Sequence, residues 1–263
     1  MNYKHTMILY EFEGKSLFKH AGISVPPSQL ITSPDQNVTL LSPMVLKAQV
    51  LSGKRAAAGG IIVVESPDQL EHRLKALFSS EINGEQVDTV LVEKKLDYEA
   101  EYYLSISYDT DTRGPLLSIS KSGGTGIEER GVQTFPIDIL HPDSGLPTTF
   151  GDLLSKLVQL FFDQDMILLE INPLVKTDQG WVALDAKIKL DDDAKFRHDD
   201  WQFPPRGVAG HKPTQREVEA KKIDQEDYRG TAGSAYFDID GDIAVLSSGG
   251  GISLTAMDAL IKC

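Results

Sequence analysis

The spacing of hydrophobic positions predicts alternating helices and strands along most of the chain. Residues 8–21 place apolar side chains at helical intervals among charged ones and end before Gly22, which predicts an amphipathic first helix. The same spacing predicts helices over residues 66–78, 153–162 and 216–224. Short apolar runs predict strands at 29–31, 44–50, 61–64, 89–92, 101–108 and 115–119. This alternation indicates the α/β class.

The segment from Glu170 to Asp185 predicts a β-hairpin. Strand residues two apart share a face, so Glu170 and Asn172 point to one side and the residue between them points into the core. If Asp178-Gln179 is a two-residue turn, Asn172 lies across from Asp185, whereas a bulged turn using Gly180 shifts this register by one. An amide oxygen beside a carboxylate is a ligand pair that suits Mg²⁺. The alternative interpretation is a plain strand end with a surface carboxylate.

The loop between residues 50 and 61 carries Gly53-Lys54-Arg55. Two cations on a flexible glycine backbone are typical of a mobile flap that covers phosphates, although the loop does not follow the Walker pattern. A solvated hairpin tip is the alternative. Lys47 is the stronger indication of a charged site, because a lysine between apolar strand residues is costly to bury unless it is paired.

The strand at 89–92 leads into a charged linker that contains Glu93 and ends near Glu101. A carboxylate in a linker between two lobes can accept hydrogen bonds from ribose hydroxyls, and the adjacent backbone can meet an adenine edge. Ordinary surface acids are an equally good interpretation of these two residues taken alone.

Composition and charge narrow the classes of function. The formal net charge of −13 repels phosphate backbones and anionic lipids, and we find no offsetting basic patch, so we expect neither nucleic-acid nor membrane binding. No stretch approaches the ~20 apolar residues that cross a bilayer, and no secretory signal is visible. The single cysteine, Cys263, cannot form an internal disulfide, so we expect a cytoplasmic protein. An acidic protein that binds a nucleotide usually recruits a divalent metal.

The C-terminal residues predict the opening of a second domain. A connecting segment at 195–213 precedes a hairpin of residues 235–239 and 243–246, and the glycine turn at 247–251 leads into a helix at 252–262. A strand, glycine turn and helix in this order are typical of a doubly wound phosphate-binding domain. One βα unit cannot bury its own sheet, so we expect either a truncated chain or a partner polypeptide that completes the domain.

These pieces follow a fixed order: a lysine-bearing strand, a cationic flap, a Val-Glu linker, a glycine loop at 123–126, the segment Glu-Ile-Asn-Pro-Leu-Val at 170–175 and an aspartate at 185. The order resembles the ATP-grasp β subunit of succinate-CoA ligase and the related portions of ATP-citrate lyase and citryl-CoA synthetase, over nearly the whole chain. The resemblance implies an α+β ATP-grasp fold of two lobes over residues 1–230, with the smaller lobe at about 24–100. Residues 231–263 would then begin a flavodoxin-like CoA-ligase domain.

The resemblance also implies roles for individual residues. Asn172 and Asp185 would hold Mg²⁺, Glu170 would steady a phosphohistidine, and Ser248 would lie at the acid substrate. Its nucleotide contacts would be Lys47, Gly53, Lys54, Arg55, Glu93, Leu96 and Glu101.

The implied enzyme is an acid-thiol ligase of the tricarboxylic acid cycle, which passes a phosphoryl group between ATP or ADP and a histidine. None of the six histidines lies in a glycine/alanine-rich loop, so an α-type subunit would supply the phosphohistidine and most of the CoA site in a hetero-oligomer. Ser24 and Ser248 depart from the family pattern, which leaves GTP use and the acid substrate open. The alternatives are a citrate-specific relative and a non-catalytic nucleotide-binding module.

Overall fold

The computed structural model divides the chain into two compact units, Met1–Lys212 and Pro213–Cys263. It describes residues 6–121, 131–204, 213–226, 236–238 and 243–246, together with 252, 255, 256 and 259. The division falls before the boundary that we expect at residue 230, so helix α4 (Gln215–Glu226) belongs to the second unit. The expected glycine loop at 123–126, Ser248 and most of the C-terminal βα unit lie outside the described residues.

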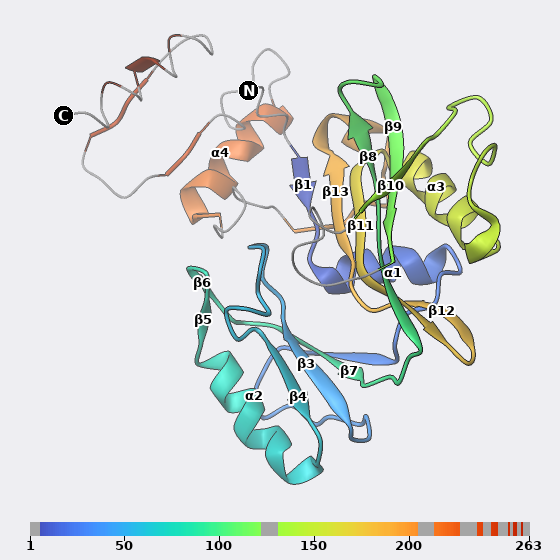
Figure 1. Cartoon of the computed structure of the whole chain (residues 1–263). Helices are drawn as coiled ribbons and strands as arrows, with labels where there is room; N and C mark the ends of the chain where they lie inside the picture. Colours follow the sequence, from blue (N-terminus) through green and yellow to red (C-terminus); the bar gives the residue numbers. More distant parts are fainter. Residues whose placement is uncertain are drawn as a thin grey trace. The chain divides into compact units, whose positions relative to one another are not determined.

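The larger lobe of the first unit is an antiparallel sheet in the order β1-β13-β11-β8-β9-β10, with β12 paired to β11 (Figure 1). The two α-helices that the structure describes in this lobe, α1 and α3, contribute to one hydrophobic core. Its elements are β1 (Thr6–Ile8), α1 (Glu11–His20), β8 (Ala100–Asp109), β9 (Gly114–Ser120), β10 (Gln133–Pro136), η3 (Thr148–Phe150), α3 (Leu153–Asp163), β11 (Met166–Thr177), β12 (Gly180–Ala183), β13 (Lys187–Asp191) and η4 (Asp192–Arg197).

The smaller lobe is an antiparallel sheet in the order β2-β7-β3-β4. Leu74 and Leu77 of its helix α2 belong to a second core, separate from that of the larger lobe. Its elements are β2 (Ser28–Ile31), β3 (Met44–Ala48), β4 (Ile61–Val64), η1 (Pro67–Gln69), α2 (Leu70–Phe78), the pair β5 (Glu81–Ile82) and β6 (Glu85–Gln86), and β7 (Val90–Lys94). Two antiparallel lobes with separate cores confirm the α+β two-lobed class.

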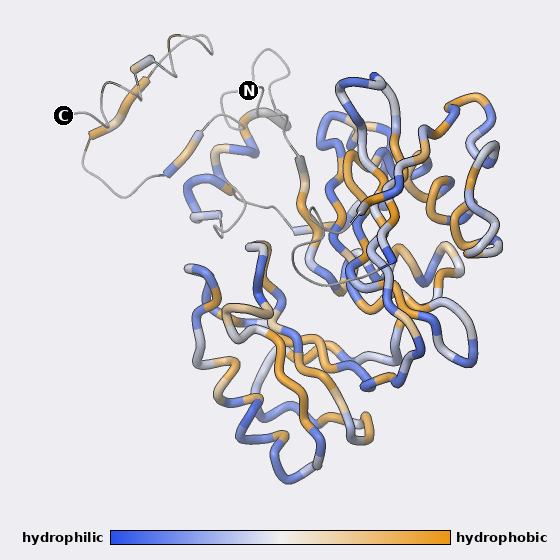
Figure 2. Tube along the Cα trace, in the orientation of Figure 1, coloured by the Kyte–Doolittle hydropathy of each residue, from blue (hydrophilic) through white to orange (hydrophobic). Residues whose placement is uncertain are grey.

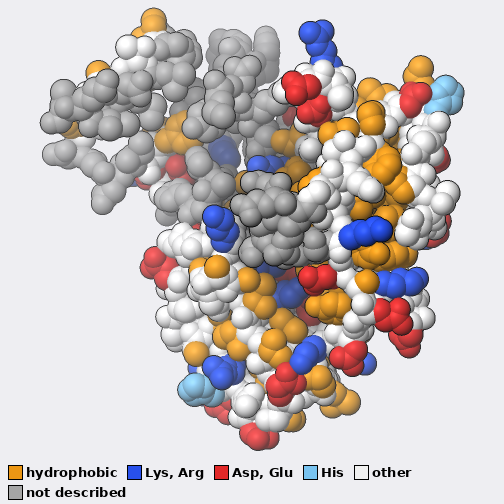
Figure 3. All heavy atoms as spheres, in the orientation of Figure 1, with side chains coloured by type: hydrophobic (Ala, Val, Ile, Leu, Met, Phe, Trp, Pro, Cys, Tyr) orange, Lys and Arg blue, Asp and Glu red, His pale blue; other side chains and the backbone are white. Residues whose placement is uncertain are grey.

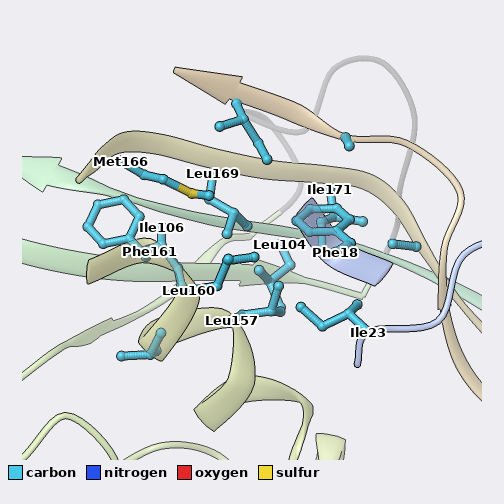
Figure 4. Close-up of a cluster of buried hydrophobic side chains, with 14 of the residues drawn as sticks. Phe18, Ile23, Leu104, Ile106, Leu157, Leu160, Phe161, Met166, Leu169 and Ile171 are labelled. Atoms are coloured by element: carbon cyan, nitrogen blue, oxygen red, sulfur yellow. The ribbon is translucent and has the colours of Figure 1, made fainter. Parts of the chain in front are cut away.

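The core of the larger lobe explains why its helices form where the pattern predicts them. Leu157 and Phe161 lie four positions apart on α3 and pack toward Leu104 and Ile106 of β8 (Figure 4). Phe18 of α1 is fully buried in the same cluster. Burial of such side chains contributes roughly 1.5–3 kcal/mol each. Hydrophobic residues follow the strands of both sheets, and the turns between them are mostly hydrophilic (Figure 2).

The start of the chain differs from the sequence-based expectation. The predicted helix at 8–21 is α1 (Glu11–His20), whereas Thr6–Ile8 forms strand β1, which pairs with β13. Helical spacing alone does not separate a short apolar strand from the first turn of a helix, because both present one apolar face.

The predicted hairpin is formed by β11 and β12. Thr177 pairs with Gly180, so Asp178-Gln179 is the two-residue turn and the bulged alternative does not occur. Pairing with β12 ends at Leu174 opposite Ala183, and the pairing of β11 with β8 shifts register between Ile171 and Leu174. Ile171 is fully buried, as the alternation predicts.

No helix in the described part of the chain is long and apolar enough to cross a membrane. On the face drawn in Figure 3, Lys and Arg side chains lie among Asp and Glu side chains.

Candidate functional site

Lys47 of β3 is the centre of a buried ionic cluster between the two lobes. Its Nζ lies 2.9 Å from Glu11 Oε1 of α1 and 2.7 Å from Glu93 Oε2 of β7, and it donates to the carbonyl oxygen of Leu184 at 2.5 Å. The Lys47 side chain is 9% exposed. A buried lysine without such partners would be costly, so the pairing meets the requirement that the sequence raised.

Lys15 of α1 uses the same three acceptors. Its Nζ lies 2.6 Å from Glu11 Oε1 and 2.6 Å from Glu93 Oε1, and donates to the carbonyl oxygen of Leu184 at 2.7 Å. Both glutamates therefore bridge two ammonium groups. This arrangement joins α1 and the β12–β13 connection of the larger lobe to two strands of the smaller lobe.

Arg55 of the flap completes the cluster. Its guanidinium pairs with Glu11 Oε2, lies 3.0 Å from Asp185 Oδ1 and donates to the carbonyl oxygen of Ala48 at 3.2 Å. Arginine suits this position because its planar fork holds several acceptors in fixed directions. The flap cation is thereby fixed beside the aspartate that the sequence predicts as a metal ligand.

The cluster balances three cations against three anions: Lys15, Lys47 and Arg55 against Glu11, Glu93 and Asp185. Burial opposes ionisation of Glu11, but the charges of Arg55, Lys15 and Lys47 together hold its pKa well below the usual value. Burial also opposes the charged form of Lys47, yet Glu11 and Glu93 raise its pKa. For Lys15, burial is the largest influence and lowers the pKa. The fixed counter-ions thus favour the charged forms of Lys47 and Arg55.

Close packing of α1 brings Glu11 and Lys15 into the cluster. A Cβ added to Gly14 would lie 3.0 Å from the Cβ of Ala186, so glycine permits this approach. The amide of Phe12 donates to Gln49 Oε1 at 3.0 Å, and the Gln49 amide donates to the Lys47 carbonyl oxygen at 3.0 Å. The beginning of α1 is therefore tied to β3 by side chains as well as by charge.

The flap is anchored at its first residues. The backbone amides of Leu51 and Ser52 donate to the Glu85 carboxylate at 3.0 and 2.7 Å. Lys54 has a φ of 58° and an exposed side chain, which leaves its ammonium facing solvent. The amide of Gly60 donates to the Arg55 carbonyl oxygen at 2.7 Å and closes a turn. The Arg55 guanidinium of the flap is thus largely buried, whereas the Lys54 ammonium group faces solvent.

Asp185 and Asn172 fit a magnesium site better than a site for a softer metal. Oδ1 of Asp185 accepts from Arg55 and from the Ala186 amide at 2.9 Å, whereas Oδ2 accepts no hydrogen bond from the described residues. The Asp185 side chain is 30% exposed, and Asn172 is half-buried. The described residues hold no group of three or more His, Cys, Asp and Glu that would bind a metal alone. Mg²⁺ needs few protein oxygens, because phosphates and water supply the others.

The remaining predicted residues differ in their exposure. Glu93 is 2% exposed, and its two oxygens lie 2.6 Å from the Lys15 ammonium group and 2.7 Å from that of Lys47. Leu96 and Glu101 are half-buried in and after the linker, and Gly53 is exposed. Glu170 lies 3.3 Å from Lys187, its partner on β13.

Sequence reasoning did not find Glu11 and Lys15. Their spacing of four positions on a helix is typical of an exposed ion pair, and the charged residues of α1 suggest a solvated face. The signal that marks them is Gly14 between them, which has no helical role and permits close packing.

One cavity of the larger lobe lies away from the ionic cluster. It has a volume of about 400 Å³ and is lined by residues of β8, β9, β10 and η3, among them Tyr102, Phe135 and Phe150. None of its lining residues belongs to the ionic cluster. Charge and burial, rather than this cavity, therefore identify the candidate site.

Comparisons with known proteins identify the family to which the chain is similar. The ATP-grasp domain family matches residues 8–143. The chain is 36% identical to the succinate-CoA ligase [ADP-forming] subunit beta of Methanocaldococcus jannaschii, covering 97% of this chain and 71% of that protein. It is 31% identical to the subunit beta 2 of Streptomyces coelicolor, covering 98% of this chain and 70% of that protein.

Among solved structures, the ATP citrate lyase of Methanothrix soehngenii, in complex with citrate and coenzyme A, has a TM-score of 0.66 and 22% identity. The match covers 84% of this chain and 60% of that one, so the chain spans less than two thirds of the lyase polypeptide. At this identity the likeness shows a common fold.

Proposed function

The chain belongs to the ATP-grasp family of succinate-CoA ligase β subunits, and we propose that it is the nucleotide-binding subunit of such a ligase. The observation that carries the proposal is the buried cluster between the lobes, in which Glu11 pairs with both Lys47 and Arg55, and Arg55 pairs with Asp185. In a protein with a net charge of −13, this gathering of cations beside an outward carboxylate suits a magnesium-bound polyphosphate.

Each group has a place in the proposed phosphoryl transfer. Lys47, Lys54 and Arg55 neutralise phosphate charge, and Gly53 lets the flap backbone approach the phosphates. Asp185 and Asn172 hold the metal, which when bound shares the phosphate charge and aligns the terminal phosphoryl group.

The nucleoside lies along the linker. Leu96 and Glu101 contact it there, and Glu93 acts through Lys47. Ser248 remains the proposed contact for the acid substrate. Leu96 and Glu101 are only half-buried, which leaves them accessible to a nucleotide.

The proposed reaction moves a phosphoryl group in two transfers. A histidine nitrogen of an α-type partner attacks the terminal phosphorus, the bond to the bridging oxygen breaks, and ADP leaves. Glu170 steadies the histidine at the nucleotide. The phosphoryl group then passes to a carboxylate oxygen, and the CoA thiolate displaces phosphate from the acyl phosphate. The relatives are named for succinate, so succinate is the first acid to test, with ATP or ADP as nucleotide and GTP as a further candidate. We place this subunit in a cytoplasmic hetero-oligomer.

The test is transfer of label to a partner. The chain is mixed with an α-type subunit, Mg²⁺ and γ-³²P-ATP, and the acid-labile, base-stable label characteristic of phosphohistidine is measured on the partner. We expect labelling by the wild-type chain and none by Asp185→Asn. Asp178→Asn is the matched control, because Asp178 is exposed at the opposite end of the same hairpin. Nucleotide binding without any label would indicate a non-catalytic module.

A second assay identifies the acid. The reconstituted ligase is supplied with CoA, Mg-ATP and either succinate or citrate, and acyl-CoA formation is measured. Succinyl-CoA as the main product supports the proposed substrate, and citryl-CoA supports the citrate alternative.

A further inference from the structure

Lys15 and Lys47 are two ammonium groups that share one set of acceptors. Each lies 2.5 to 2.9 Å from Glu11, Glu93 and the carbonyl oxygen of Leu184. Lys15 donates hydrogen bonds to Glu93 and Leu184 and forms an ion pair with Glu11, whereas Lys47 donates to Glu11 and Leu184 and forms an ion pair with Glu93. An ammonium group has three donors. Two donors of Lys47 are taken by Glu11 and Leu184, and its charge is also paired with Glu93, so a phosphate oxygen competes with these acceptors for the ammonium group.

Burial separates the two lysines. The side chain of Lys15 is 2% exposed, as are those of Glu11 and Glu93, whereas Lys47 is 9%, Arg55 12% and Asp185 30% exposed. The first three form an inner layer that is almost closed to solvent. The last three form a more exposed outer layer.

The inner layer allows Lys47 to change partners without leaving a buried carboxylate uncompensated. When Lys47 turns toward a phosphate, Lys15 still neutralises Glu11 and Glu93 and still donates to Leu184. Without Lys15, three carboxylates would face two cations, which would hold Lys47 more firmly and repel phosphate. Resting on the proposed function, we propose that Lys15 is a positioning residue that releases Lys47 for the nucleotide phosphates by remaining as counter-ion to Glu11 and Glu93.

The test is a double-mutant cycle read by calorimetric binding of Mg-ADP. Lys15→Met removes the inner cation, and we expect affinity to fall on the order of 10- to 100-fold. In that background, Glu11→Gln restores charge balance and should tighten Mg-ADP binding again. If Lys15 had a purely structural role, adding Glu11→Gln as a second buried substitution would weaken Mg-ADP binding further. A weaker double variant, or an unchanged affinity in Lys15→Met, overturns the proposal.

The matched control is Lys75→Met. Lys75 pairs with Glu71 at the same helical spacing and the same 2.6 Å distance, but both side chains are more than half exposed. We expect no change in Mg-ADP affinity. If the wild-type chain itself does not bind Mg-ADP, the proposed function is wrong. If the wild-type chain binds Mg-ADP but the variants do not show the expected changes in affinity, only the role proposed for Lys15 is wrong.

A measurement on the wild-type chain covers the case in which Lys15→Met does not fold. The ¹⁵N signals of the two buried ammonium groups are recorded by NMR with and without Mg-ADP and assigned with Lys47→Arg. We expect the Lys47 signal to shift and that of Lys15 to stay in place. A Lys15 signal that moves as far as that of Lys47 contradicts the proposal.

Discussion

Gly14 lies so close to Ala186 that a residue with a Cβ at position 14 would crowd the Ala186 side chain. A Cβ on Gly14 would lie 3.0 Å from the Ala186 Cβ and 3.2 Å from Cδ1 of Ile188. The Ala186 methyl group has no rotamer that moves it away, so the helix backbone itself would have to shift. This contact sets the distance of α1 from the connection that carries Leu184 and Asp185.

Gly14→Ala is therefore expected to destabilise the protein, although alanine is the better helix former by about 1 kcal/mol. Overpacking of this kind costs about 1–3 kcal/mol, which is measured as a loss in the free energy of unfolding in urea. Ala186→Gly makes room for the new methyl group, so Gly14→Ala should cost less in that background. Ser16→Ala, on the exposed side of the same helix, is the control for helix propensity. An equal cost in both backgrounds would contradict the steric explanation.

Glu85 is expected to control the order of the flap. Glu85→Gln removes the charge and one of the two oxygens that accept from the Leu51 and Ser52 amides. Losing a hydrogen bond to a charged group costs about 1.5–3 kcal/mol, so hydrogen exchange at these amides should accelerate by roughly 10- to 150-fold. Glu81→Gln, at an exposed position of the neighbouring strand, should leave exchange unchanged. Unchanged exchange in Glu85→Gln would mean that other contacts hold the flap.

The elements were largely predictable because each has a local signal. The alternation at Ile171, the Asp178-Gln179 turn and the apolar spacing of α3 all depend on residues near one another in sequence. Lys47 was predictable in a different way: its burial between apolar neighbours required counter-charges, although the pattern did not say which residues supply them.

Glu11 and Lys15 were not predictable because their partners are distant in sequence. Glu93 lies 78 positions from Lys15, and nothing local distinguishes the Glu11–Lys15 pair from the exposed Glu71–Lys75 pair. Their burial follows from how the two lobes close over α1. Strand β1 was missed for a related reason, since it forms only because β13 is available as a partner.

Arg55→Lys tests whether the flap needs a guanidinium. One ammonium group cannot replace the contacts with Glu11, Asp185 and the Ala48 carbonyl oxygen with the same directions. We expect Mg-ADP affinity to fall by about 10- to 100-fold in calorimetry, which corresponds to the loss of one or two charge-assisted hydrogen bonds. Lys54→Arg keeps the charge at the exposed flap position and should change affinity far less. If Arg55→Lys and Lys54→Arg lowered the Mg-ADP affinity equally, a special role for the buried Arg55 guanidinium would be contradicted.

Glu11→Gln tests the electrostatics of the cluster through its dependence on pH. Removing one partner from a buried ion cluster costs roughly 3–5 kcal/mol, so at pH 7 the variant should be less stable than the wild-type protein by about this amount. The pKa of Glu11 is lowered in the folded state against the opposing influence of burial, by the charges of Arg55, Lys15 and Lys47. The ionised form therefore favours folding: its contribution is complete above the ordinary value of 4.5 and is lost as the pH falls through the lowered pKa.

Urea denaturation of both proteins between pH 7 and pH 3.5 should accordingly show a constant difference in the free energy of unfolding down to about pH 4.5, and a shrinking difference below it. Glu71→Gln, which removes the acid of the exposed pair, should follow the wild-type curve throughout. A difference that grew on acidification would mean that Glu11 is protonated in the folded protein at neutral pH, and the charge balance of the cluster would have to be reassigned.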